Sequence, residues 1–274
     1  MMRRVTMMLA AALAMAAAPS MWAQKAPQPK SQKEVEALQG IQKAQGPDAQ
    51  LKAIDNVLEN FADTEYKTML LQMAMQIAEQ KGDYASTITY GERLLEADPK
   101  NVFADSTLAL ETAAHTREFD LDKEEKLAKA EKYAKAAIEN AKDTPKIRPD
   151  ITDEQWNNVK KDIVAQAHDS LGRIAMLRNQ YPAAINEFKT SIESGATPDS
   201  TTVVRLGDAY LRSGNYDEAI VQFDKAAAMP NAPAQVKQVA AAKKAEAVKA
   251  KATGAKPAAP STTVTPGQVE IKKP

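Results

Sequence analysis

The chain has 274 residues, with 36 basic and 36 acidic residues and only 5% aromatic residues. This length is enough for one substantial core or for an elongated array of smaller units. The few aromatic residues and the many Ala and Lys residues argue against a β-sandwich or barrel and favour helices. No cysteine occurs, so disulfides and a lipid-modified cysteine are excluded.

Residues 1–23 have the features of a secretory signal peptide. A basic start, "MMRR", precedes an apolar run from about Met7 to Ala18 and small residues near Ala23. The apolar run is shorter than the roughly 20 residues that a bilayer span requires. We therefore expect cleavage near Ala23 and a periplasmic or secreted protein without a membrane span. An uncleaved N-terminal anchor is the alternative.

Residues 24–63 are predicted to be a short polar linker and a helical hairpin. Ser31 and Glu34 have the spacing of a capping box at the start of the first helix. "GPD" at 46–48 interrupts the pattern, and apolar residues at helical spacing resume at Leu51 and Ile54.

A repeated pattern follows. The turns "GDY" at 82–84, "NQY" at 179–181 and "GNY" at 214–216 each end one predicted helix and begin the next. Three further pairs of residues lie 35 positions apart: Gly172 and Gly207, Ala184 and Ala219, and Phe188 and Phe223. Matching positions at one offset indicate an internal repeat.

These residues resemble the tetratricopeptide repeat, a unit of about 34 residues in two antiparallel helices. The best unit spans about 200–233, and the unit before it spans about 165–199. The resemblance implies an all-α solenoid of helical hairpins. The residues expected to pack the two clear repeats are Leu206, Gly207, Tyr210, Tyr216, Ala219, Phe223, Gly172, Ala184 and Phe188.

Residues 64–145 are expected to hold two divergent repeats. The first keeps Gly82 and Tyr84 but has Met75 in place of the first glycine. The second, from about residue 102 to 143, is degenerate, and Phe119 stands roughly where Tyr84 would repeat. Residues 146–232 are expected to hold one long helix and the two clear repeats. A capping box at Thr152 predicts that the long helix spans about 153–177.

The C-terminal part is basic. Residues 233–274 hold eight lysines and two glutamates. Because the whole chain has a formal net charge of zero, the rest of the chain carries a net negative charge. Residues 233–252 are predicted to form a helix that caps the repeat stack, and residues 253–274 a disordered tail. The segment lacks arginine and aromatic residues, so we expect no nucleic-acid binding.

Two local clusters suggest chemistry, but each has a simpler interpretation. His168, Asp169 and Ser170 are consecutive on a helix, where side chains point about 100° apart and cannot form a relay. Four acids have the spacing of a calcium loop, but its central position holds Glu125, where the sharp turn requires glycine. These acids are Asp120, Asp122, Glu124 and Glu131. We therefore expect no catalytic residue, no metal site and no cofactor.

The resemblance implies that the first helices of successive repeats line a concave groove that binds a protein or peptide. The polar residues expected to face this groove are Gln72, Gln76, Glu79, Asp169, Arg173, Asp208 and Arg212. The lysine and asparagine pattern by which some members bind a terminal carboxylate is absent.

The hypothesis from the sequence is a non-catalytic scaffold or adaptor in envelope assembly, secretion or maintenance. The alternatives are a metal or small-ligand receptor that uses residues 120–131, and a structural homo-oligomer.

Overall fold

The computed structural model describes residues 27–146 and 150–254. The predicted signal peptide and most of the predicted tail therefore lie outside the described residues. Within the described ranges the chain forms eleven α-helices and no strand. The helices are α1 (Gln32–Lys43), α2 (Pro47–Asn60), α3 (Lys67–Lys81), α4 (Tyr84–Ala97), α5 (Val102–His115), α6 (Lys123–Asn140), α7 (Asp153–Leu177), α8 (Tyr181–Ser194), α9 (Ser200–Ser213), α10 (Tyr216–Ala228) and α11 (Ala234–Thr253).

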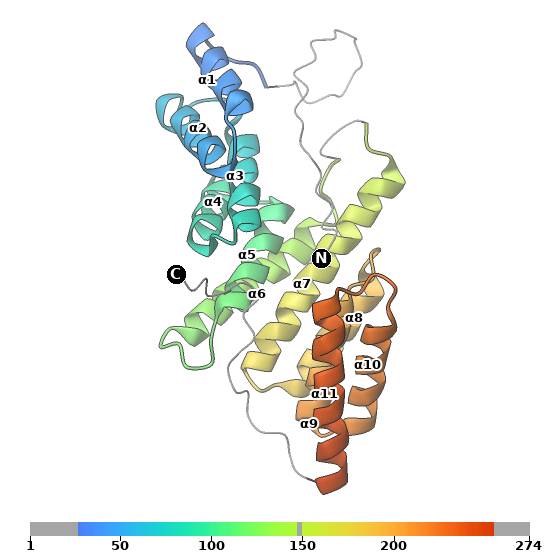
Figure 1. The fold of residues 1–274 in the computed structure, drawn as a ribbon. Helices are drawn as coiled ribbons and strands as arrows, with labels where there is room; N and C mark the ends of the chain where they lie inside the picture. The colour runs from blue at the N-terminus through green and yellow to red at the C-terminus, as the bar shows by residue number, and fades with distance from the viewer. Residues whose placement is uncertain (1–26, 147–149, 255–274) are drawn as a thin grey trace, which may run out of the picture.

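The helices stack as successive hairpins along one direction (Figure 1). Each odd-numbered helix from α1 to α9 packs against the helix that follows it, and α11 packs against α10 and α9. We call α3, α5, α7 and α9 the first helices of their hairpins, and α11 lies where a fifth such helix would follow. The all-α solenoid predicted from the sequence is confirmed.

The ends of two helices test the capping predictions. At α7, the Thr152 side chain accepts a hydrogen bond from the backbone of Gln155, and the Gln155 side chain bonds back to Thr152, so the predicted box is formed. At α1, Ser31 caps the backbone of Glu34, but the Glu34 carboxylate turns elsewhere. It accepts hydrogen bonds from the Lys30 N–H at 2.6 Å and the Thr64 hydroxyl at 2.6 Å. The box prediction at α1 is therefore only half right, because a buried contact with Thr64 attracts the carboxylate.

The three matching turns have one backbone structure. Each contains a residue with left-handed φ: 70° at Gly82, 58° at Asn179 and 87° at Gly214. In each turn the next N–H bonds to the carbonyl five residues earlier, and the left-handed residue bonds to the one three residues earlier. This pair of hydrogen bonds is the Schellman motif, and glycine adopts its left-handed conformation with the least strain. The three turns are thus the same structure, as predicted.

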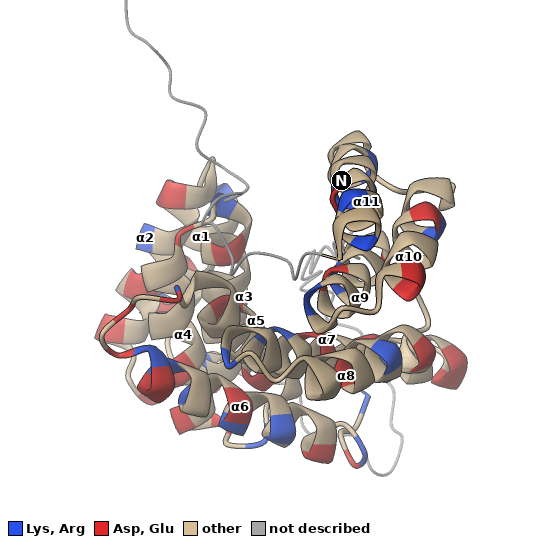
Figure 2. Cartoon of the chain, turned by 90° about the horizontal axis from the view of Figure 1, so that it is seen from below, with Lys and Arg blue, Asp and Glu red and all other residues tan. Residues whose placement is uncertain are grey.

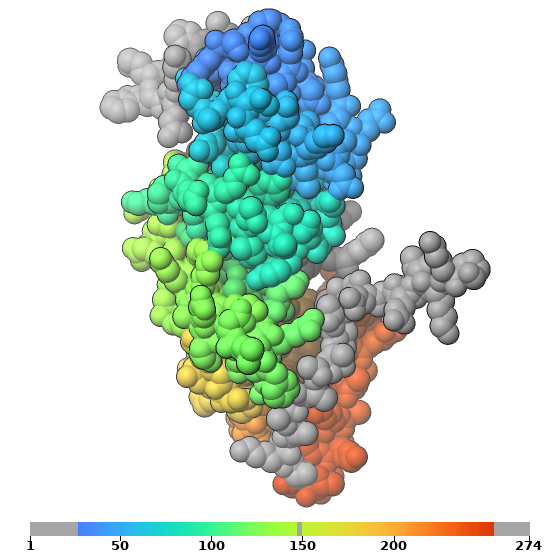
Figure 3. All heavy atoms as spheres, turned by 90° about the vertical axis from the view of Figure 1, so that its left-hand side faces the viewer, coloured from blue at the N-terminus to red at the C-terminus, as the bar shows by residue number. Residues whose placement is uncertain are grey.

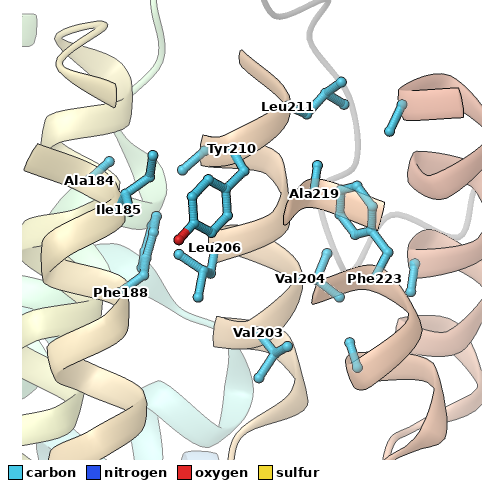
Figure 4. Close-up of a cluster of buried hydrophobic side chains, with 14 of the residues drawn as sticks. Ala184, Ile185, Phe188, Val203, Val204, Leu206, Tyr210, Leu211, Ala219 and Phe223 are labelled. Atoms are coloured by element: carbon cyan, nitrogen blue, oxygen red, sulfur yellow. The ribbon is translucent and has the colours of Figure 1, made fainter. Parts of the chain in front are cut away.

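Close contacts between glycine and phenylalanine hold the two clear hairpins together. A Cβ added at Gly207 would lie 2.6 Å from the Phe223 ring, and one at Gly172 would lie 2.5 Å from the Phe188 ring. Both rings are fully buried, and Figure 4 shows them on opposite sides of α9, with Tyr210 and Leu206 between. The three atoms nearest to the Cβ position of Gly207 all belong to Phe223, so this ring lies directly against the backbone of α9.

Gly207→Ala tests this packing. Because the new methyl group has no room against the Phe223 ring, we expect the free energy of unfolding to fall by about 1–3 kcal/mol. Gly40→Ala on α1 is the matched control, since nothing lies within 4 Å of its Cβ position. There alanine should stabilise by about 0.5–1 kcal/mol through helix propensity. Urea denaturation measures both, and a stabilised Gly207→Ala variant would contradict the contact.

A buried carboxyl group lies inside the third hairpin. Asp105 on α5 is 2% exposed and accepts a hydrogen bond from the Asn140 side chain of α6 at 3.0 Å. Burial raises the pKa of Asp105 to about 6. The folded chain therefore binds this proton more tightly than the unfolded chain, and the free energy of unfolding falls as pH rises from about 4 to about 6.

Asp105→Asn should remove this pH-dependent cost. Since one pKa unit corresponds to about 1.4 kcal/mol, we expect the variant to be more stable at pH 7 by up to about 3 kcal/mol. At pH 4, where the native carboxyl is protonated, the gain should disappear. Thermal melts across this pH range measure it, with the exposed Glu59→Gln as control. A variant that is less stable at pH 7 would refute the assignment.

Candidate functional site

Charged side chains of three helices form two clusters of ion pairs, one between α7 and α9 and one between α9 and α11, and together we call them the charged ladder. Its members are Asp169, Arg173, Arg205, Asp208, Arg212 and Lys243. Two of them, Arg205 and Lys243, were not among the residues predicted to face the groove. The ladder joins helices in the positions of successive first helices, which is where the predicted groove would lie.

The first rung centres on Asp169 of α7. Its carboxylate accepts hydrogen bonds from Arg173 Nε at 3.0 Å, four residues along the same helix, and from Arg205 Nη1 of α9 at 2.9 and 3.0 Å. The Thr202 hydroxyl donates a further bond at 3.1 Å. These contacts tie α7 to α9 through a single carboxylate.

The second rung repeats this construction one hairpin later. The Asp208 carboxylate of α9 lies 2.9 Å from Arg212 Nε, again four residues along, and 2.9 Å from Lys243 Nζ of α11. Lys243 also pairs with Glu246 at 3.1 Å. In both rungs an acid is held by an arginine of its own helix and by a cation of the next first helix.

In the first rung the acid is more buried than the two cations that bind it. The Asp169 side chain is 7% exposed, whereas those of Arg173 and Arg205 are 22% and 25% exposed. Burial alone would raise the pKa of Asp169, but the guanidinium groups of Arg205 and Arg173 outweigh it and hold the pKa below its ordinary value. The carboxylate therefore stays charged and fixes the two guanidinium groups in place.

The predicted groove residues have different environments. The prediction that Asp169 faces an open groove was wrong: its side chain is buried and binds the arginines of the ladder. Arg173, Asp208 and Arg212 are partly exposed members of the ladder. Gln72, Gln76 and Glu79 are partly exposed on α3, in an earlier hairpin. Arg205 could have been found from its position three residues before Asp208, which places both on one face of α9.

The two clusters that suggested chemistry are accounted for by other contacts. His168 Nδ1 lies 2.7 Å from Glu187 of α8, and the Ser170 hydroxyl donates to the Gln166 carbonyl, so no relay forms. Arg178 binds Glu124 at 3.0 Å and Glu131 at 2.7 Å, from outside the segment proposed for calcium. Among the described residues, no three His, Cys, Asp or Glu side chains are grouped to hold a metal ion.

Comparisons with known proteins agree with the fold. The tetratricopeptide repeat family matches residues 201–232. The solved structure of TTC0263, a thermophilic tetratricopeptide-repeat protein of Thermus thermophilus, superposes with a TM-score of 0.52 at 18% identity, covering 77% of this chain and 98% of that one. MamA superposes with a TM-score of 0.43 at 19% identity, covering 67% and 87%. The chain has no match among the curated proteins. No helix in the described ranges is long and apolar enough to cross a membrane.

The two rungs should respond differently to loss of their acids. Asp169→Asn leaves two partly buried guanidinium groups without their counter-ion, so we expect a loss of about 3 kcal/mol or more. Asp208→Asn should cost less, because the Asp208 side chain is 20% exposed and Lys243 retains Glu246. Urea denaturation at pH 7 compares them. Equal losses would contradict the anchoring role of Asp169.

Proposed function

The chain is a tetratricopeptide-repeat protein, and from this we propose that it is an exported, non-catalytic scaffold that binds a partner polypeptide across its first helices. Its repeats support a role in protein–protein interaction. The observation that carries the proposal is the charged ladder, because its ion pairs bridge α7 to α9 and α9 to α11, helices in the positions of successive first helices.

The ladder suits the binding of a polypeptide. Its cations are partly exposed, and the acids beneath them restrict their orientation before any partner arrives. Such pre-organisation reduces the entropy lost on binding. Arginine also forms paired hydrogen bonds with carboxylates and single bonds with carbonyl oxygens. The partner segment that fits this surface presents acidic side chains or free backbone carbonyls, such as those at a helix C-terminus.

The proposed location rests on the leader. Residues 1–23 have the order of a basic start, an apolar run and small residues, and the chain contains no cysteine for lipid attachment. We assign the protein to the periplasm or exterior, with a role in envelope assembly, secretion or maintenance. A scaffold in this compartment would hold envelope proteins together through contacts rather than by chemistry.

Site-specific photo-crosslinking in intact cells tests this function. A photoreactive residue placed at Gln76 of α3 or Lys243 of α11 should capture a polypeptide partner. The same residue at Lys132 of α6 or Glu218 of α10, both on second helices, should capture little. The crosslinked chain should appear in the periplasmic or secreted fraction and, by intact mass, should lack about residues 1–23.

Two results would overturn the proposal. If all four positions gave equal crosslinks, the first helices would not form the binding surface. If the chain kept its N-terminal segment and remained in the cytoplasmic fraction, the assignment to the envelope would be wrong.

A further inference from the structure

Four large apolar side chains are exposed in the described part of the chain, and they lie in two places. Phe119 is 82% exposed and Leu121 is fully exposed, and both belong to the loop 116–122 between α5 and α6. The other two, Val221 and Val248, lie on α10 and α11. Exposed apolar side chains that gather in one short loop indicate a contact surface. Phe119, which stands roughly where Tyr84 would repeat, is thus exposed, whereas the Tyr84 ring stacks on His115.

The loop 116–122 has a defined shape that turns its apolar residues outward. The Asp120 carboxylate accepts hydrogen bonds from the Arg117 N–H at 3.0 Å and from Lys126 Nζ at 3.0 Å. The Asp120 carbonyl also accepts a bond from the Lys123 N–H at 3.1 Å. The polar residue is thus bound inward while Phe119 and Leu121, on either side of it, point to solvent.

An apolar groove lies at the C-terminal end of the stack, between α10 and α11. It has a volume of about 620 Å³. Its accessible apolar walls are Ala227, Ala241, Ala245 and Val248, which lie over the buried Phe223 and Ala240. Since α11 lies where a fifth first helix would, the groove is on the side where the second helix of that unit would pack. No helix of the described residues covers it.

Loop and groove have opposite charge around their apolar centres. Residues 117–125 hold five acids and two basic residues. Helix α11 holds five lysines and one glutamate, visible as the blue segments of α11 in Figure 2. Lys244, Lys249 and Asp224 line the groove itself, and Asp224 pairs with Lys244 at 2.7 Å. In the loop, Lys126 pairs with Asp120 and Asp122, and Arg178 pairs with Glu124, so a small net negative charge remains. A net acidic loop with apolar side chains therefore matches a net basic groove with apolar walls.

We propose that the loop 116–122 of one copy of this protein docks into the α10–α11 groove of a second copy, with Phe119 and Leu121 as the inserted side chains. The occupant is a second copy rather than the same chain, because the two features lie on different sides of the molecule. The loop between α5 and α6 lies at the left of Figure 1, the side that faces the viewer in Figure 3, whereas α10 and α11 lie toward the lower right of Figure 1.

The contact joins two different surfaces, so each docked copy still presents a free loop or a free groove. Such an interface can repeat from copy to copy. One loop in one groove buries a small area, and the association should therefore be weak and dependent on concentration. This inference does not depend on the partner proposed for the charged ladder, which uses a different surface.

Sedimentation of the full mature chain at rising concentration tests the docking. The wild-type chain should form dimers or larger species. Phe119→Ser with Leu121→Ser should weaken association about tenfold or more, because two apolar side chains no longer leave water. Ala241→Glu should have the same effect from the groove side. Val221→Ser is the control: it removes an exposed apolar side chain that does not line the groove.

Mixing gives a sharper test. The loop variant keeps its groove and the Ala241→Glu variant keeps its loop, so an equimolar mixture should form a dimer that neither variant forms alone. Because the chain contains no cysteine, Leu121→Cys and Ala245→Cys can be mixed under mild oxidation. The disulfide should join the two different variants faster than it joins two copies of either one.

Three results would overturn the proposal. The wild-type chain could remain a monomer at every concentration. It could associate equally well with the loop or groove changed, which would place the interface elsewhere. It could also associate only after truncation at Gly254, which would show that the C-terminal segment of the same chain covers the groove.

Discussion

The fit of a phenylalanine ring against a glycine is the contact on which the rest of the C-terminal stack depends. At Gly207 and Phe223, as at Gly172 and Phe188, the absence of a Cβ lets the ring lie directly against a helix backbone. This sets the distance between the two helices of each hairpin. It also sets how the following hairpin packs, and so allows Arg205 of α9 to reach the carboxylate on α7.

The fold could be predicted where its signals are local. Turn residues, caps and a 35-residue offset lie close together in the sequence, and they gave the three equivalent turns and the bounds of α7 correctly. The packing of the divergent hairpins was harder to predict, because their close glycine contact lies at a different position from that in the two clear repeats. Met75 fills the position of the missing glycine and is 1% exposed, while Gly91 on α4 meets Leu108 of the next hairpin. The same need for close approach is met at another interface, which spacing alone does not reveal.

The candidate site could be predicted only in part, for a related reason. Spacing of four residues identified Arg173 beside Asp169 and Arg212 beside Asp208. The cations from the next helix lie more than 30 residues away, and their register depends on how the hairpins pack. The burial of Asp169 also follows from the packing of α9 rather than from α7 itself. Spacing along one helix therefore identified the pairs within α7 and within α9, but it could not reveal that Asp169 is buried.

In a stack of repeats each hairpin buries its apolar surface against the next hairpin. Apolar surface therefore stays exposed where the series is interrupted. Two interruptions stand out: the loop 116–122, where the repeat motif is degenerate, and α11, a first helix whose second helix does not follow within the described residues. In the regular hairpins the corresponding positions hold a turn with a half-buried tyrosine or a packed neighbouring helix. Where the repeat pattern is lost, Phe119 and Leu121 stay exposed and the α10–α11 groove stays open. The surfaces available to a partner therefore lie at the departures from the repeat that builds the fold.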